Sequence, residues 1–233
     1  MVNKESRQIR LMFASIAHRY DLLNRLLSFS LDRRWRRVTV QRLSPFLPSQ
    51  AVVLDLCTGT GDLALELSAK ARVLGCDFCH PMLVLGKEKM GSSVRFVEGD
   101  ALLLPFPAHS FDAVTIGFGL RNLEDYTSGL GEMFRVLRPG GMLAVLEFSQ
   151  PQIPVFRQLY FWYVSWILPK VGQCLSGKLG PYAYLPQSVK EFPDPKTLEE
   201  LIQKVGFTTR GYYALTGGIV TLHLAQRVAI GRA

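Results

Sequence analysis

The stretch VLDLCTGTGD, Val53 to Asp62, ends an apolar run with an acid, two spaced glycines and a second acid. The apolar run predicts a buried strand over 52–57, and residues 62–69 have the spacing of a helix. Gly59 and Gly61 stand where the strand passes into this helix. In an open α/β sheet, ligands bind at the carboxyl edge of the strands. Because glycine has no Cβ, the pattern predicts that a ligand comes close to the backbone here.

The rest of the chain repeats this alternation of short apolar runs and helical patterns. Further strands are predicted at 72–78, 94–100, 111–118, 142–148, 207–215 and 219–226, and further helices at 81–89, 125–137 and 196–205. Apolar strands separated by helices indicate βαβ units and a parallel sheet that is covered on both faces. The predicted fold class is therefore α/β with a mostly parallel sheet.

The 233 residues are most simply one domain in four parts. Residues 1–48 read as basic helices, at 7–17, 21–29 and 33–43. Residues 49–150 hold the regular alternation, 151–195 form an insertion rich in aromatic residues, and 196–233 add a helix and a hairpin. The uncharged run at 158–168 is far shorter than the ~20 residues of a membrane span.

The formal net charge is +8, and residues 1–43 hold ten Lys or Arg against three Asp or Glu. Such a region can meet nucleic acid, an anionic membrane surface or an acidic substrate, or it can be a solvated face. The sequence shows no RNA-binding module and no basic–aromatic platform, so no nucleic-acid partner is predicted. The polar first ten residues do not resemble a signal peptide, which favours a cytoplasmic location.

The four cysteines predict no metal site. Cys76 and Cys79 form a CxxC, but Cys57 and Cys174 do not supply a second pair of ligands at a matching spacing. They are expected to be small thiols in a reducing compartment.

Two classes of cofactor fit the glycine loop. Residues 59–64, GTGDLA, match the loose dinucleotide pattern GxGxxA. In that fingerprint, however, the first glycine normally follows the strand directly, whereas here the pattern is DxCxGxG, starting at Asp55. This is similar to the first motif of the S-adenosylmethionine-dependent methyltransferases of Rossmann-like fold. The resemblance implies a seven-stranded sheet, with Asp55, Thr58, Gly59 and Gly61 in the cofactor loop.

Two further acids follow the next strands. Asp77 ends the second strand, where a carboxylate can accept hydrogen bonds from both hydroxyls of a ribose, and this fits either cofactor. Asp100 follows the third strand and can accept the amino group of adenine, with the backbone N–H of Ala101 on the ring. The methyltransferase pattern expects an acid at this place.

Three longer stretches carry a closer resemblance: FASIAHRYDLLNRLLSFSLDRRWRR at 13–37, GFGLRN at 117–122 and MFRVLRPGGMLAVLEFSQP at 133–151. Together with YAYLPQSVKEFPD at 182–194 they resemble the ubiquinone/menaquinone biosynthesis C-methyltransferase family. The resemblance covers nearly the whole chain. It implies methyl transfer from S-adenosylmethionine to a ring carbon of a prenylated quinol, either a demethylmenaquinol or a ubiquinol precursor. Residues 49–150 would be the cofactor-binding core, with 1–48 as a lid.

The same resemblance points to four catalytic candidates. Arg121 and Asn122 follow the fourth strand, where we expect Arg121 to stabilise a phenolate and Asn122 to orient a hydroxyl. Tyr20 and Asp21, in HRYDLLN, are expected to reach over the site and to supply the proton acceptor. Alternatively, Arg121 pairs with Glu124 or Asp125, and Tyr20–Asn24 only cap and pack a helix.

The aromatic segment Val155–Trp166 has three possible interpretations: an apolar wall of the site for the prenyl tail, a membrane-contacting surface, or a buried helix. An apolar surface around 162–168 would serve a homodimer, and the basic residues Arg33–Arg37 would lie on anionic lipid, peripheral to the membrane. Three other hypotheses stay open: an NAD-linked oxidoreductase, a methyltransferase acting on RNA, and a non-catalytic scaffold of the quinone pathway.

Overall fold

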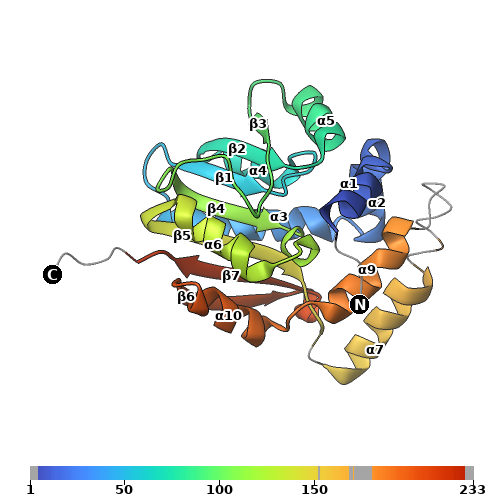
Figure 1. Cartoon of the computed structure of the whole chain (residues 1–233). Coiled ribbons are helices and arrows are strands. Elements are labelled where there is room, and N and C mark those ends of the chain that lie inside the picture. The colour runs from blue at the N-terminus through green and yellow to red at the C-terminus, as the bar shows by residue number, and fades with distance from the viewer. Residues whose placement is uncertain (1–4, 152, 168–169, 171–179, 229–233) are drawn as a thin grey trace.

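The computed structural model describes residues 5–151, 153–167, 170 and 180–228. These form one sheet with helices on both faces (Figure 1). The strands are β1 Val52–Leu56, β2 Arg72–Asp77, β3 Arg95–Glu98, β4 Phe111–Gly117, β5 Leu137–Phe148, β6 Thr208–Leu215 and β7 Val220–Gln226.

The seven-stranded sheet has the order β3-β2-β1-β4-β5-β7-β6. The five strands β1 to β5 pair in parallel, and β7 runs antiparallel between β5 and β6. The predicted fold class is confirmed. One boundary differs: β5 begins at Leu137 rather than Met142, because Leu137 already pairs with Phe111 ahead of an irregularity in the register.

The helices also follow the predicted order. They are α1 Ser6–Ala14, α2 Ala17–Leu27, α3 Leu31–Leu43, α4 Asp62–Ser68, α5 His80–Met90, α6 Tyr126–Val136, α7 Pro154–Trp162, α9 Gly180–Glu191 and α10 Pro195–Lys204. Short helical turns lie at η1 Ser44–Phe46, η2 Leu120–Asn122 and η4 Thr216–Gly218, and a π-helical turn, η3 Tyr163–Ile167, extends α7. Residues 168–169 and 171–179 of the predicted insertion, with Cys174, lie outside the described residues.

Two helix starts show why the chain folds locally as it does. Asp125 accepts the N–H groups of Thr127 and Ser128 and so caps α6, at 2.8 and 3.2 Å. Asp194 caps α10 in the same way, just before Pro195. Such caps satisfy N–H groups that have no partner within the helix, and each is worth about 1 kcal/mol.

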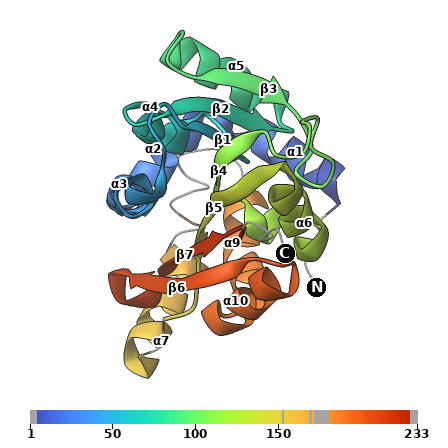
Figure 2. The same ribbon diagram turned by 90° about the vertical axis from the view of Figure 1, so that its left-hand side faces the viewer.

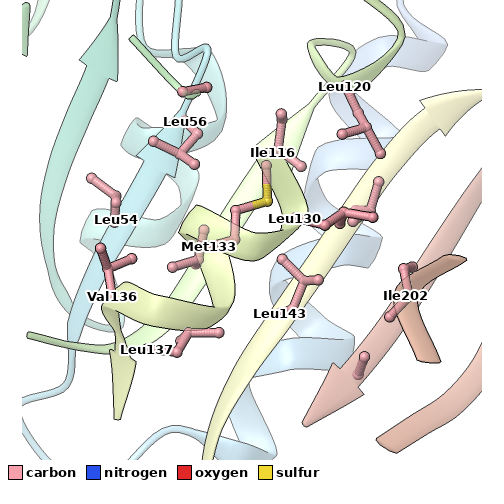
Figure 3. Close-up of a cluster of buried hydrophobic side chains, with 14 of the residues drawn as sticks. Leu54, Leu56, Ile116, Leu120, Leu130, Met133, Val136, Leu137, Leu143 and Ile202 are labelled. Atoms are coloured by element: carbon pink, nitrogen blue, oxygen red, sulfur yellow. The ribbon is translucent and has the colours of Figure 1, made fainter. Parts of the chain in front are cut away.

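The core lies on both faces of the sheet. Alternate residues of β1 point to opposite sides, Leu54 and Leu56 to one cluster and Val53 to the other. Figure 3 shows the first cluster, in which Met133 and Val136 of α6 pack on the strands. The second cluster is covered by α3 and α4, and Figure 2 shows these two helices on the opposite side of the sheet from α6 and α10.

The remaining helices gather at one end of the sheet. Figure 1 shows α1, α2, α7 and α9 together beyond the ends of the central strands. α1 contacts α5 and α9, and α2 contacts α3 and α5. No helix in the described part of the chain combines the length and the apolar content that crossing a bilayer takes. The predicted N-terminal helices and the insertion therefore meet above the carboxyl edge of the sheet, where the sequence predicts a ligand.

Candidate active site

The carboxyl ends of β1, β2 and β4 border a narrow groove that α1 covers. The cover consists of Ser6, Ile9 and Phe13. Ser6 fastens it, because its N–H and its hydroxyl both donate to Glu124 Oε1, at 2.5 and 2.7 Å. The groove has a volume of about 60 Å³, whereas ligand sites typically have ~300–1,000 Å³. A ligand the size of a nucleoside therefore needs an outward movement of α1.

The two glycines of the opening motif have different roles. Gly59 lines the groove with φ +58°, and a Cβ built on it would meet only Tyr20 Cε1, at 3.9 Å. Gly61, with φ +84°, stands at the start of α4 and is absent from the groove lining; its Cβ would lie 2.7 Å from Met90 Cε. At Gly59 a ligand can come close to the backbone, as the sequence predicted. At Gly61 a glycine is needed for another reason, because a side chain there would collide with Met90. The structure does not bring Gly61 to the groove.

Asp77, Asp100 and Ala101 also line the groove. Asp77 is buried, and its two carboxylate oxygens each accept one backbone N–H at 2.8 Å, from Gly59 and from Cys79. Burial raises the pKa of Asp77 to about 6, although these hydrogen bonds act in the opposite direction. Asp100 is exposed and accepts the N–H of Leu102 at 2.9 Å. These three residues are brought together as predicted.

Asp55 and Thr58 line a smaller pocket beside the groove, together with Tyr20 and Arg36. The Asp55 carboxylate accepts the hydroxyls of Thr58 and Thr115, both at 2.6 Å. Burial raises the pKa of Asp55 to about 6, against the lowering effect of these two hydroxyls. Through these two hydrogen bonds Asp55 ties the loop that follows β1 to β4.

The CxxC residues are buried side chains in this region. Cys76 and Cys79 are free thiols and line the groove. Burial raises the pKa of Cys76 to about 12, so its thiol stays protonated at neutral pH. In the described residues, no group of three or more His, Cys, Asp or Glu is arranged to hold a metal ion.

A second, larger cavity of about 380 Å³ lies between α2, α3, η3 and α9. Its lining is mostly aromatic and aliphatic, with a few polar groups at one end. The apolar part includes Leu27, Phe29, Trp35, Phe148, Leu159, Tyr160, Trp162 and Leu185, and the polar part includes Tyr20, Asn24, Asp32, Arg36 and Arg121. A mostly apolar cavity with a few convergent polar groups is typical of a small-molecule site.

Arg121 lines this cavity and is 6% exposed. Its Nη1 donates to Glu147 Oε1 at 2.7 Å and to the carbonyl of Phe118. Glu147 is fully buried and also accepts the N–H of Arg121, at 3.2 Å. The sequence alternative of a pair with Glu124 or Asp125 is wrong, because Glu124 is held by Ser6 and Asp125 caps α6.

The Nε–H of Arg121 is buried and has no hydrogen-bond acceptor within the described part of the chain. Leaving a buried donor unpaired costs about 1–3 kcal/mol, and more when the group is charged. An unpaired cationic donor beside an apolar cavity is a candidate partner for a ligand oxygen.

Asn122 lines the groove, and its side chain is engaged at both ends. Its Oδ1 accepts the hydroxyl of Tyr184 at 3.0 Å, and its Nδ2 donates to the carbonyl of Phe118 at 3.4 Å. Tyr184 belongs to α9 and lines the apolar cavity. Asn122 therefore connects the groove to the insertion, which the sequence did not predict.

Tyr20 lies between the two cavities, since it lines both. Burial raises the pKa of its hydroxyl, while the nearby Asn24 and the cations Arg121 and Arg36 act in the opposite direction. With a raised pKa the hydroxyl stays protonated at neutral pH, so Tyr20 is a hydrogen-bond donor. The prediction that Tyr20 accepts a proton does not fit this environment.

Asp21 lies where α2 meets the glycine loop and α5, and its role as acceptor of the substrate proton stays a prediction. Its carboxylate accepts the hydroxyl of Thr60 at 2.5 Å and pairs with Lys89 at 2.7 Å. It is absent from the lining of both cavities. Asp21 joins α2 to the glycine loop and to α5, and its contacts therefore fix the lid.

The groove and the cavity share a wall of three aromatic residues, Phe13, Tyr20 and Phe118. Phe13 and Tyr20 meet edge to face, with ring centroids 5.9 Å apart. Phe118 has φ +61°, a left-handed backbone conformation that is strained for a bulky residue, and its ring lies 4.8 Å from that of Phe148. Strain of this kind concentrates at functional sites. A group bound in the groove and a group bound in the cavity would be separated only by these three side chains.

Three residues of the site were not singled out from the sequence. Glu147 and Phe118 occur inside quoted motifs but read as ordinary strand and loop residues. Arg36 was included only in a basic patch, yet it is buried and pairs with Asp32 and Asp62, at 2.5 and 3.6 Å. The one available signal was Glu147 itself, because an acid that ends a fully apolar strand requires a partner.

The comparisons with known proteins agree with this geometry. The model of the ubiE/COQ5 methyltransferase family matches residues 1–227. A demethylmenaquinone methyltransferase of Thermus thermophilus is 50% identical over 222 residues, which cover 93% of this chain and 100% of the relative. The ubiquinone/menaquinone biosynthesis C-methyltransferase UbiE of a Geobacter species is 43% identical over 97% of this chain and 99% of its own length.

Solved structures share the fold at low identity. A chain of the Haloferax volcanii complex between the Trm112 methyltransferase activator and a putative methyltransferase superposes with a TM-score of 0.68 at 16% identity, over 93% of this chain and 98% of that one. A SAM-dependent methyltransferase of Aquifex aeolicus gives 0.60 at 19% identity, over 82% and 89%. The family match, which spans nearly the whole chain, is the stronger finding: the chain belongs to the ubiE/COQ5 methyltransferase family.

Proposed function

We propose that this protein methylates a ring carbon of a prenylated quinol, a demethylmenaquinol or a ubiquinol precursor, with S-adenosylmethionine as the methyl donor, in respiratory quinone biosynthesis. The observation that carries the proposal is the aromatic wall between a nucleoside-type groove and an apolar cavity that contains Arg121. The relatives named demethylmenaquinone methyltransferase and UbiE support the substrate class.

The groove residues fit the cofactor. The space over Gly59 is open, and the Asp77 carboxylate, which accepts backbone N–H groups including those of Gly59 and Cys79, lines the groove, where it would accept ribose hydroxyls. Asp100 and Ala101 would hold the adenine. S-adenosylmethionine supplies a methyl group that the positive sulfur has already activated for transfer.

The polar end of the apolar cavity would bind the quinol ring. Arg121 would donate a hydrogen bond from its unpaired Nε–H to the ring oxygen that gains negative charge, and Tyr20 would donate a second one. Stabilising a developing oxyanion in a dry site is among the largest catalytic effects, worth ~2.7–4 kcal/mol for one donor. Because Arg121 lowers the cost of the phenolate, the ring hydroxyl can give its proton to solvent water as the ring enters the site, without a dedicated carboxylate base. Asn122 would act by holding Tyr184 against the cavity.

The apolar remainder of the cavity would take the first part of the prenyl tail. A tail of this kind resides in a bilayer, so we infer that the protein works at the cytoplasmic face of the membrane as a peripheral protein. The tail also explains why a site for one ring has a lining of mostly aromatic and aliphatic side chains.

The test is the quinone composition of cells that lack the protein. Mass spectrometry should find a quinone lighter by one methyl group, and the wild-type gene should restore the full mass. Arg121→Ala should fail to restore it, whereas Arg138→Ala, which breaks an ion pair with Asp112 at the surface, should succeed. Unchanged quinones in the deletion strain, or tight NADH binding without binding of S-adenosylmethionine, would refute the proposal.

A further inference from the structure

The outer face of α7 and η3 carries a row of exposed apolar side chains. Val155, Leu159, Trp162 and Trp166 are 77%, 59%, 54% and 62% exposed. Their spacing of four, three and four residues is that of one face of a helix. The opposite face is buried, because Tyr160 packs against α2. A helix with one face in the protein and a second apolar face outward is typical of a surface that meets another apolar phase.

A second row lies on α2 beside the first. Leu22 and Leu26 are 57% and 49% exposed, and Phe29, just after the helix, is 77% exposed. Tyr163 joins the two elements, since its hydroxyl donates to the carbonyl of Leu27 at 2.9 Å and its ring lies 6.1 Å from that of Phe29. We call the two rows together the apolar rim: Leu22, Leu26, Phe29, Val155, Leu159, Trp162 and Trp166.

The rim surrounds the mouth of the apolar cavity. Phe29, Leu159 and Trp162 line that cavity and are nevertheless more than half exposed. The cavity therefore reaches the surface between the two rows. Its opposite end is the polar group around Arg121. A long apolar ligand with its ring at Arg121 would leave the protein through the rim.

The chain around the α7 row is basic in sequence. Residues 148–190 contain no Asp or Glu, and Arg157 and Lys170 are exposed. On the other side, Arg33 and Arg34 are exposed at the start of α3, directly after Phe29. Each such cation near an anionic membrane surface strengthens binding by about fivefold, from ~1 kcal/mol per Lys or Arg.

We propose that the apolar rim inserts into the surface of an anionic bilayer, with the mouth of the cavity open toward the acyl chains. The prenyl tail then stays in lipid while the ring reaches the catalytic end. A second copy of the chain would also cover the rim, and the experiment below distinguishes it from a bilayer. The identity of the tail rests on the proposed function, but the docking of the rim does not.

The experiment measures binding of the purified full chain to vesicles of phosphatidylcholine with and without 30% phosphatidylglycerol. Val155→Ser/Trp166→Ser removes two rim side chains that do not line the cavity. Leu65→Ser/Val84→Ser is the matched control, with two side chains 43% and 42% exposed on α4 and α5. We expect the rim variant to bind anionic vesicles at least about tenfold more weakly, from ~1.5–3 kcal/mol per buried apolar side chain. The control should bind as the wild type does.

Quenching of tryptophan fluorescence by brominated lipid gives a second readout. Trp162 and Trp166 should be quenched on vesicles, and Trp166→Phe should reduce the quenching, whereas the buried Trp35 should not contribute. Equal vesicle binding by the rim variant and the wild type would overturn the inference. So would a wild-type dimer in sedimentation that the rim variant disrupts, together with no vesicle binding.

Two methylation assays separate this inference from the proposed function. With a water-soluble short-tailed quinol, the rim variant should keep the wild-type kcat/KM, because the catalytic end is untouched. With a long-tailed quinol in anionic vesicles, its rate should fall by about the loss in vesicle binding. Normal vesicle binding without methylation of either quinol would refute the proposed function alone, and methylation of both at wild-type rates by the rim variant would refute the docking alone.

Discussion

Arg121 and Glu147 form a buried ion pair whose geometry decides how the guanidinium faces the cavity. Glu147 takes Nη1 and the main-chain N–H, and the guanidinium carbon lies 5.3 Å from the centroid of the Phe148 ring. The two hydrogen bonds to Glu147 and the contact with the Phe148 ring leave the Arg121 side chain little conformational freedom. A preorganised donor stabilises a transition state without the cost of reorienting at the moment of reaction.

Glu147→Gln tests this orientation, because it keeps the shape of the side chain and removes the charge. Breaking a buried pair by removing one partner typically costs about 3–5 kcal/mol, so the free energy of unfolding in urea should fall by that amount. The kcat should fall strongly, while the Kd for S-adenosylmethionine, whose proposed site lies on the far side of the aromatic wall, should change little. Arg138→Gln is the control: its pair with Asp112 is 45% exposed on the arginine side, so less than about 1 kcal/mol is at stake. A normal kcat in Glu147→Gln would contradict the positioning role.

Asp77 gives cofactor binding a pH dependence. Burial raises the pKa of its carboxyl to about 6, and the ionised form accepts two ribose hydroxyls best. As the pH rises through about 6, the carboxyl loses its proton and the affinity for S-adenosylmethionine should rise. Calorimetry between pH 5 and 8 should show this increase in the wild type and a weaker, flat profile for Asp77→Asn. An affinity of the wild type that is constant over this range would contradict the assignment.

At the scale of the elements, α1 is the part that must move. Its cover over the groove is fastened where Ser6 donates twice to the exposed Glu124, and these hydrogen bonds lower the pKa of Glu124. Glu124→Ala should release the cover, so that S-adenosylmethionine associates and dissociates several times faster, because both hydrogen bonds from Ser6 are lost. Stopped-flow fluorescence measures both rates. Glu66→Ala, which removes only a surface partner of Arg37, is the control and should leave both rates unchanged.

The elements of the sheet could be predicted, whereas the contacts of the lid could not. Continuous apolar runs bounded by turns predict strands because burial on both faces admits few polar residues. Asp21 shows the limit. Its partners Thr60 and Lys89 lie 39 and 68 residues away in the sequence, and no local pattern announces them. The motif HRYDLLN can therefore be located from the sequence, whereas the role of each of its residues depends on which distant side chain it contacts.

For the whole molecule, the same limit applies to the site. The acids Asp77 and Asp100 could be placed because parallel strands end at one edge of a sheet, so order along the chain becomes proximity in space. No comparable rule predicts the apolar cavity from the sequence. Leu27, Trp35, Tyr160 and Leu185 come from four separate helical segments, and only their packing creates a space.

The cavity as a whole predicts how methylation depends on the length of the prenyl tail. With the ring at Arg121, the tail has the remainder of the cavity of about 380 Å³ before it reaches the exposed Phe29 and Trp162. Each buried CH₂-sized group contributes about 0.8 kcal/mol to binding, so each prenyl unit inside the cavity should raise kcat/KM by tenfold or more. Units beyond the mouth should add nothing for quinols dissolved in detergent.

Kinetics with quinols of increasing tail length measure this dependence. The expected profile is a steep rise followed by a plateau, and Trp35→Ala, which enlarges the cavity, should move the plateau to a longer tail. Tyr212→Ala changes an exposed ring on β6, outside the cavity lining, and should leave the profile as it is. An increase that continues over all lengths would mean that the tail lies along the surface, and a flat profile would mean that the cavity holds another part of the substrate.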